Sequence, residues 1–414
     1  MIDFMKRSLA ALALVLSPAA LAAPFDGMVD VGAGKLHVLQ MGEGPVTVVF
    51  EAGFGSDMSA WRKVAPEIAK KSSVLVYSRA GSGQSPARPH GMPLAASAAE
   101  FERMLAALKV KGPLILVGHS YGAFLIRSYA AHHPEQVAGL VFVDPADEGI
   151  ENVLKRIDDK RVALDRRTLM QMTPPAFQDE LRLVQQIMDG GSLPAMPALP
   201  DVPATVLTSV RSDPHAEFFI ETPQAVKIKR ERHQAFFAQF SGGAHVVTAN
   251  SGHAIQMQEP ELVIAAIEQV REAAGRNAQR VAQQKAKQAL MAELEKVAAS
   301  LAAGKEQEAG ALLAAAIAAS QFGEAQINTL GFDVLTKARQ VQLATLILGH
   351  NANQYAQSHN AADSYGEALM AQGRPKEAGV QFERALALGK AGKASERALA
   401  AYQDNVNKAQ AAIR

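Results

Sequence analysis

Short apolar runs alternate with amphipathic segments over residues 25–275, and this alternation limits the fold more than any other feature of the sequence. The runs are rich in Val, Leu and Ile, which is typical of parallel strands buried on both faces of a sheet. The segments between them have the apolar period of helices, so the sequence predicts an α/β domain with a mostly parallel sheet covered by helices. The predicted strands are Lys35–Gln40, Val46–Glu51, Ser73–Ser78, Leu114–Gly118, Gly139–Asp144, Thr205–Val210 and Val246–Thr248, and the predicted helices are Leu94–Val110, Ala123–His132, Gln224–Phe240 and Pro260–Ala274.

One interval interrupts the alternation. Residues 146–200 contain no convincing strand, but they carry amphipathic segments rich in Arg, Asp, Leu and Met and end in a Pro-rich stretch from Pro194 to Pro203. An amphipathic segment of this length needs an apolar surface to cover. We therefore predict that residues 146–200 form a helical lid over one end of the sheet.

The composition changes after Gly275. From Arg276 to Arg414 the chain is rich in Ala, Gln, Lys and Glu, and it contains a single proline, Pro375. These residues are good helix formers, and their apolar positions follow a helical period. The sequence therefore predicts a second, smaller domain that is all-α and covers residues 276–414.

Part of this region resembles tetratricopeptide repeats. The pairs Leu330-Gly331 and Tyr365-Gly366 are 35 residues apart, and each begins a helix-turn-helix pattern. Gly366, Ala378 and Ala385 stand at small positions where paired helices of such repeats interlock, whereas Arg339 departs from the pattern in the first repeat. The resemblance covers about residues 327–388 and implies a protein or peptide partner.

The N-terminus has the layout of a secretory signal peptide. Lys6 and Arg7 precede the apolar run Leu9–Leu16, which is followed by Pro18 and small residues at 19–23. The run is shorter than the ~20 residues of a transmembrane helix, so no stable membrane insertion is expected. We predict a signal peptide over residues 1–22, cleavage after Ala22, and export to the periplasm or the medium.

Composition excludes several classes of function. The formal net charge is +1, so no general electrostatic field attracts nucleic acid, and no nucleic-acid partner is expected. The chain has no cysteine, which excludes thiolate nucleophiles and Cys-based metal sites. The glycine-rich stretch Ser78–Ser85 lacks the Lys-Ser/Thr ending of a P-loop and the spacing of a dinucleotide site. No cofactor and no metal are expected.

The pentapeptide Gly118-His119-Ser120-Tyr121-Gly122 carries the strongest chemical signal, since it has the pattern G-x-S-x-G and joins a predicted strand to a predicted helix. In that setting a sharp turn strains the serine backbone and exposes its hydroxyl. The flanking glycines leave room for the turn, and the helix N-terminus stabilises negative charge. Ser120 is therefore the predicted nucleophile.

A serine nucleophile needs a base and an acid that orients the base. His253 follows the last predicted strand and lies at the same edge of the sheet as Ser120, so it is the predicted base. Two acids end on this edge in the chain order Ser, Asp, His: Asp213, which we favour, and Asp144, which is the alternative. Each precedes a proline and also fits a structural turn.

Acyl transfer also needs N–H donors directed at the developing oxyanion. The backbone N–H of Phe54 is one candidate, because Gly53-Phe54 follows the strand that ends at Glu51. The N–H of Tyr121, directly after the nucleophile, is the second candidate.

Taken together, these motifs resemble the α/β-hydrolase family over about residues 28–275. Gly118–Gly122 matches its nucleophile elbow, Gly53-Phe54 its oxyanion turn, Arg79–Ser85 its second glycine-rich loop and His253 its terminal histidine. Two positions depart from the family pattern. Ser78 stands where an Asp is usual, and the turn after Val210 lacks the usual Gly, which leaves the acid open.

The resemblance and the residues together predict an exported serine hydrolase. It would cleave an ester or similar acyl bond of a small-molecule acyl substrate through an acyl-enzyme, and the Gly53-Phe54 turn implies small or medium acyl groups. A peptidase or amidase of the same fold is an alternative within enzymes. The alternative outside enzymes is an inactive hydrolase domain in a binding protein whose repeats recruit a partner.

Overall fold

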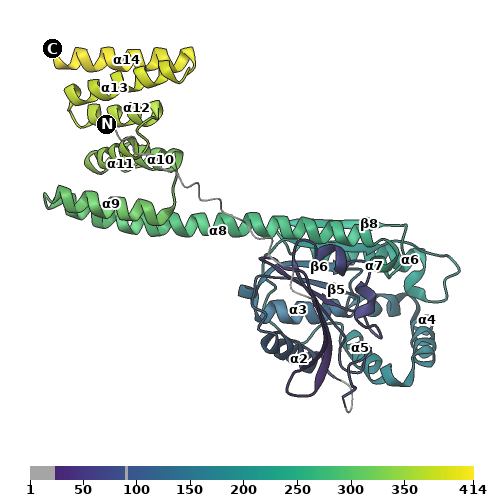
Figure 1. Ribbon diagram of the computed structural model, residues 1–414. Helices are drawn as coiled ribbons and strands as arrows, with labels where there is room; N and C mark the ends of the chain where they lie inside the picture. Colours follow the sequence, from purple (N-terminus) through teal and green to yellow (C-terminus); the bar gives the residue numbers. More distant parts are fainter. Residues whose placement is uncertain (1–23, 89–91) are drawn as a thin grey trace, which may run out of the picture. The chain divides into compact units, whose positions relative to one another are not determined.

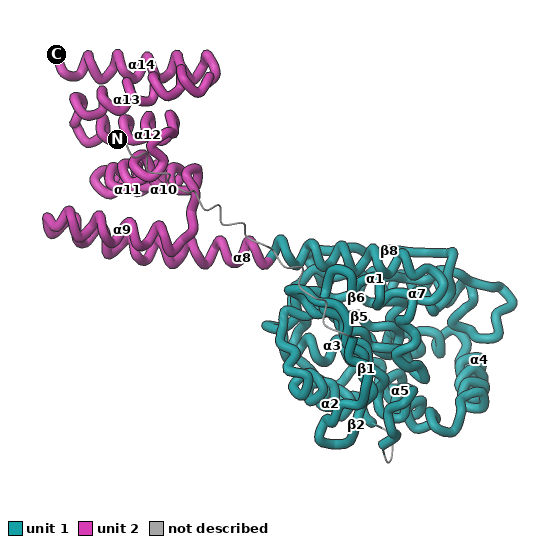
Figure 2. Tube along the Cα trace, in the orientation of Figure 1, with its two compact units in different colours: residues 1–277 teal, residues 278–414 magenta. Residues whose placement is uncertain are grey.

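The computed structural model describes residues 24–88 and 92–414 (Figure 1). The predicted signal peptide at residues 1–22 lies outside the described residues. The chain divides into two units, residues 1–277 and residues 278–414, close to the change in composition at Gly275 (Figure 2).

An eight-stranded sheet forms the centre of the first unit, with the order β1-β2-β4-β3-β5-β6-β7-β8. β2 pairs antiparallel with β1 and β4, and the other neighbours pair parallel, so the predicted mostly parallel α/β sheet is confirmed. β1 was not predicted; its residues alternate between exposed and half-buried, which gives a weak apolar signal. The strands are β1 Phe25–Asp30, β2 Lys35–Met41, β3 Thr47–Glu51, β4 Ser73–Tyr77, β5 Leu114–His119, β6 Val137–Val143, β7 Ala204–Ser209 and β8 Gly243–Thr248.

Helices cover both faces of this sheet (Figure 1). Successive strand residues point to opposite faces, so Leu116 joins one apolar cluster and its neighbour Val117 joins the other. The first cluster is closed by α2 Leu94–Ala107, α3 Gly122–His132 and α6 Pro223–Phe237. The second is closed by α1 Ala65–Ile68, α7 Ile255–Gln258 and the first turns of α8 Pro260–Ala302.

Two helices occupy the interval between β6 and β7. These are α4, Ile150–Met172, which is interrupted by non-helical backbone at Asp158, and α5, Gln178–Gly190. Their apolar residues face the core through Ile150, Leu154 and Leu181. This helical segment, residues 146–200, therefore leaves the sheet at the end of β6, which is the edge that carries the predicted catalytic residues.

The second unit is helical throughout its described residues. One expectation at its start is wrong: the helix that begins at Pro260 does not end near Ala274 but continues to Ala302, so α8 contributes residues to both units. The helices that follow are α9 Glu306–Ser320, α10 Glu324–Thr336, α11 Val341–Gln354, α12 His359–Ala371, α13 Pro375–Ala391 and α14 Glu396–Ile413. Among the residues that the structure describes, no helix has both the length and the apolar character needed to cross a membrane.

Glycines bring neighbouring helices of the second unit into close contact. A Cβ at Gly366 of α12 would lie 2.5 Å from the ring of Phe382 on α13, and a Cβ at Gly331 of α10 would lie 2.5 Å from Leu348 on α11. Ala378 and Ala385, on the same helix as Phe382, are fully buried. The small residues of the repeat-like stretch are therefore packing positions, while the repeat family itself stays a prediction.

This contact gives a test with a matched control. We expect Gly366→Ala to lower the free energy of unfolding of the second unit by about 1–3 kcal/mol, because the added methyl overpacks the contact with Phe382. Gly310 lies on α9 with nothing within 4 Å of its Cβ position, so Gly310→Ala should be neutral or gain up to about 1 kcal/mol. Urea unfolding followed by far-UV circular dichroism measures both. Equal stabilities of the two variants would contradict the packing role of Gly366.

Candidate active site

Ser120 occupies the sharp turn between β5 and α3. Its φ is 51°, in the left-handed region that side chains rarely adopt. Two close approaches make this turn possible: a Cβ at Gly118 would lie 2.9 Å from the carbonyl oxygen of Gly122, and a Cβ at Gly122 would lie 2.6 Å from that of Glu51. The strained turn holds the Ser120 side chain at the edge of the sheet, where it lines a cavity.

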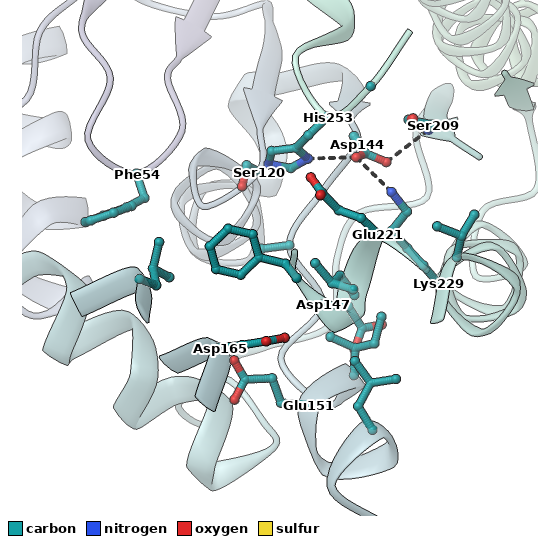
Figure 3. Close-up of a pocket in the computed structure, with 18 of the residues that line it drawn as sticks. Phe54, Ser120, Asp144, Asp147, Glu151, Asp165, Ser209, Glu221, Lys229 and His253 are labelled. Atoms are coloured by element: carbon teal, nitrogen blue, oxygen red, sulfur yellow. Dashed lines mark hydrogen bonds and ion pairs between the residues drawn. The ribbon is translucent and has the colours of Figure 1, made fainter. Parts of the chain in front are cut away.

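The imidazole of His253 lies between Ser120 and a buried carboxylate (Figure 3). Its Nδ1 is 2.7 Å from Oδ2 of Asp144, and its ring lies beside the Ser120 side chain in the close-up. His253 is reached from the cavity, because 54% of its side chain is exposed, whereas Asp144 is fully buried. The structure thus brings together a hydroxyl, an imidazole and a carboxylate in the order that a charge-assisted serine nucleophile requires.

The favoured acid, Asp213, does not lie at this position in the structure. Its carboxylate accepts a hydrogen bond from the backbone N–H of His215 at 2.8 Å, as in an ordinary Asx turn. Asp213 lines the cavity, but its residue is exposed and forms no hydrogen bond or ion pair with His253. Asp144, the alternative, makes the contact with His253; it directly follows β6, and its φ of 39° lies in the left-handed region.

Three groups hold the Asp144 carboxylate in place (Figure 3). Oδ1 accepts from the backbone N–H of Ser209 on β7 at 3.0 Å, and Oδ2 accepts from Nζ of Lys229 on α6 at 3.0 Å as well as from His253. Burial alone would raise the pKa of Asp144, but the hydrogen bond from His253 and the charge of Lys229 outweigh it and hold that pKa well below its usual range. Asp144 is therefore ionised at any pH at which a protein of this kind works.

The loop that carries His253 is held from several sides. The hydroxyl of Ser209 donates to the carbonyl oxygen of Ser251 at 2.7 Å, and the hydroxyl of Ser251 donates to Glu259 at 2.5 Å. Nε2 of His119, the residue before the nucleophile, donates to the carbonyl oxygen of His253 at 3.0 Å. Burial lowers the pKa of His119 to about 3, so this ring is neutral and acts as a fixed donor.

Sequence reasoning missed Lys229 and left His119 without a role in the site. Lys229 is one of several basic residues on α6, and no local pattern distinguishes it from a solvent-exposed lysine. His119 lies inside the G-x-S-x-G motif, so its position could have indicated that it has a role in the site.

The two predicted oxyanion donors lie on either side of the nucleophile. A Cβ at Gly53 would lie 3.4 Å from Cβ of Ser120, so the turn after β3 is in van der Waals contact with the elbow. Phe54 and Tyr121 both line the cavity next to Ser120. Tyr121 stands at the N-terminus of α3, where backbone N–H groups have no partner within the helix. The placement is compatible with both residues donating to an oxyanion, which stays a prediction.

The cavity in front of Ser120 has a volume of about 910 Å³. Carboxylates also line it, and besides Asp144 three of them form ion pairs: Glu151 with Arg166, Asp147 with Arg232 and Asp165 with Arg161. Among the described residues no group of His, Asp and Glu is arranged to hold a metal ion. Residues of the helical segment 146–200 form an apolar wall of this cavity, namely Ile150, Leu154, Val162, Leu169, Leu181, Val184 and Met188.

Comparisons with known proteins agree with this architecture. Residues 46–183 match the family model described as alpha/beta hydrolase fold. The chain is 26% identical over 227 residues to the uncharacterised protein YqjL of Bacillus subtilis, covering 55% of this chain and 83% of that protein. It is 37% identical over 119 residues to the lipase LipV of Mycobacterium tuberculosis, covering 27% and 42% respectively. The carboxylesterase CesB of Bacillus subtilis superimposes with a TM-score of 0.41 at 16% identity, covering 60% of this chain and 91% of that one.

The family match spans β3 to α5 and includes the nucleophile elbow, and the order of the eight strands extends the agreement to β8. The first unit therefore has the α/β-hydrolase fold, and residues 46–183 of this chain are similar to the α/β-hydrolase family.

Proposed function

We propose that this protein is an exported serine hydrolase that cleaves an ester or similar acyl bond through an acyl-enzyme. The observation that carries the proposal is the hydrogen bond of 2.7 Å between Asp144 and His253, with the His253 ring beside Ser120. The family relationship supports hydrolysis in general, and the lipase and carboxylesterase among the similar proteins support an ester.

The arrangement gives each residue a role in a two-step reaction. His253 takes the proton of the Ser120 hydroxyl as its oxygen attacks the acyl carbon, and the N–H groups of Phe54 and Tyr121 stabilise the carbonyl oxygen as it becomes negative. His253 then gives the proton to the leaving alcohol. Water attacks the acyl-enzyme by the same route, which releases the acid and restores Ser120. Asp144 stabilises the imidazolium in both steps.

The cavity supports a small or medium acyl substrate with an apolar part. About 910 Å³ is in the range of pockets that take small molecules. The apolar wall formed by the helical segment 146–200 would hold the hydrocarbon part of the substrate, since each buried CH₂ contributes about 0.8 kcal/mol. This segment therefore serves as the lid of the site in our proposal.

Two further parts of the proposal rest on the sequence. The basic and apolar residues at 1–22 support export, and the repeat-like helices α10 to α13 support a protein or peptide partner. A protease-protection assay on intact cells tests the first, and capture of partners with residues 278–414 removed or present tests the second.

Labelling by a fluorophosphonate probe tests the nucleophile. We expect the wild-type protein to be labelled and Ser120→Ala to be unlabelled while keeping its far-UV spectrum. Ser120→Ala and His253→Ala should each lower kcat for a p-nitrophenyl ester by about 10⁴–10⁶, because the members of such a set act as a unit. Labelling of Ser120→Ala, or a correctly folded wild-type protein that the probe does not label, would contradict the proposal and favour the binding-protein alternative.

Substitution of each of the two aspartates tests which of them orients His253. We expect Asp144→Asn to lower kcat by about 10³–10⁴, because the neutral amide no longer stabilises the imidazolium of His253. Asp213→Asn is the matched control, since it removes a charge from the same cavity without touching His253. Its kcat should stay close to that of the wild type. A large loss of kcat in Asp213→Asn with little loss in Asp144→Asn would instead identify Asp213 as the acid.

The pH profile tests the base. The base must be neutral to accept the Ser120 proton, so kcat/KM should fall as the pH is lowered from about 8 to about 5. Burial lowers the pKa of His119 to about 3 and that of His233 to about 4, so both rings stay neutral there and do not produce this limb. Stopped-flow ester hydrolysis from pH 4 to 9 measures it. A profile that is flat down to pH 5 would contradict a histidine base.

A further inference from the structure

A buried arginine next to the nucleophile has no role in the chemistry described so far. Arg79 lies on the loop after β4 and is 8% exposed. Its Nη1 donates to Oε1 of Glu51 and to the carbonyl oxygen of Ala52, both at 2.6 Å. Its Nη2 donates to the carbonyl oxygen of Gly53 and to Oε1 of Glu180, both at 2.8 Å. One guanidinium thus binds two successive carbonyl groups of the oxyanion turn.

The bond to Gly53 fixes the direction of the Phe54 N–H. The carbonyl of Gly53 and the N–H of Phe54 belong to one peptide group, which is trans, so the two point in opposite directions. The Gly53 oxygen also accepts from the N–H of Ser56 at 3.3 Å, which closes the turn. Arg79 therefore holds one end of this peptide group and leaves its N–H directed away from the guanidinium, in a turn that contacts Ser120.

The same guanidinium also contacts the second predicted donor. Its Cζ lies 5.2 Å from the centroid of the Tyr121 ring, within the range of a cation–π interaction. Arg79 therefore contacts the peptide group that carries the Phe54 N–H and the ring of Tyr121, while it lines no part of the cavity itself.

Glu180 connects this arginine to the helical segment 146–200. It lies in the first turn of α5, and its Oε1 accepts from Nε of Arg79 at 3.1 Å as well as from Nη2. Its Oε2 accepts from the N–H of Gly55 in the oxyanion turn at 3.3 Å. A single carboxylate thus joins α5 to Arg79 and to the turn that Arg79 holds.

We infer that Arg79 is a positioning residue for the oxyanion turn, and that Glu180 is the contact through which helix α5 keeps it in place. The inference rests on the proposed serine hydrolase function. Because one residue of α5 holds both the guanidinium and the turn, the Phe54 N–H is oriented for the oxyanion only while α5 lies over the site. Movement of α5 would weaken catalysis without any change at Ser120, His253 or Asp144.

Variants of Glu180 test this, with Asp189 as the matched control. Asp189 lies at the other end of α5 and pairs with Lys155 and Arg166 of α4 at 2.9 and 2.8 Å, far along the helix from Arg79. Loss of a whole oxyanion donor costs about 10²–10³ in kcat, so a misdirected donor in Glu180→Ala should cost about 10–100-fold, with KM changed by less than about threefold. Glu180→Gln keeps an acceptor and should restore part of kcat, and Asp189→Ala should leave kcat close to the wild type.

Two inhibitors distinguish a misdirected oxyanion donor from general damage to the site. A trifluoromethyl ketone adds the Ser120 oxygen to its carbonyl carbon, its carbonyl oxygen becomes the oxyanion, and His253 takes the serine proton. The methyl ketone of the same chain length binds the cavity largely without this addition. In Glu180→Ala, and in Arg79→Lys where it folds, the inhibition constant of the trifluoromethyl ketone should rise about as much as kcat falls, while that of the methyl ketone changes by less than about threefold.

Equal losses of kcat in Glu180→Ala and Asp189→Ala, or a parallel rise of both inhibition constants, would overturn the inference and leave the proposed function intact. A folded wild-type protein that neither hydrolyses p-nitrophenyl esters nor reacts with the fluorophosphonate would overturn the proposed function, and the inference with it. Inhibition constants for the two ketones, measured on all variants with their thermal unfolding midpoints, decide between these outcomes.

Discussion

The contact that the rest of the site depends on is the passage of α3 over the end of β3, where no side chain separates the two. A Cβ at Gly122 would collide with the carbonyl oxygens of Glu51 and Ala52, so the first turn of the helix lies directly on the strand end. This close passage sets the Ser120 elbow against the turn at Gly53. The elbow at Ser120 and the turn at Gly53 come from segments far apart in the sequence, and this close backbone packing brings them together.

Each buried carboxylate of the site is paired with donors from separate elements. Asp144 receives a strand N–H, a helix lysine and a loop histidine, so its ionised form is held by β7, α6 and the segment after β8 together. Such a carboxylate fixes the tautomer and the orientation of the imidazole, because Nδ1 must carry the proton that it donates. The orientation of the His253 ring is therefore a property of the packed domain and not of the local motif.

The sequence was sufficient for seven of the eight strands, the turn at Ser120 and the position of His253, because each of these depends on local apolar periods and short-range turn chemistry. The choice between the two aspartates needed more. Both end strands on the same edge, and the side-chain direction at Asp144 depends on a positive φ and on Lys229, which is distant in the chain. The end of α8 was misplaced for a simpler reason: Gly275 costs a helix only about 1 kcal/mol, and strong helix formers surround it. The contacts of Arg79 join residues that are distant in the chain, so no local sequence pattern predicts them.

Asp144, directly after β6, is the acid that contacts His253, so no residue of the loop that follows β7 is needed for that contact. Residues 211–221 still contribute to the wall of the cavity through Arg211, Asp213, Phe218 and Glu221. Mutations accumulating in this loop can therefore change which molecules enter without disturbing the chemistry at Ser120. In this loop, residues that shape the cavity wall are thus separate from the residues that contact His253 and Ser120.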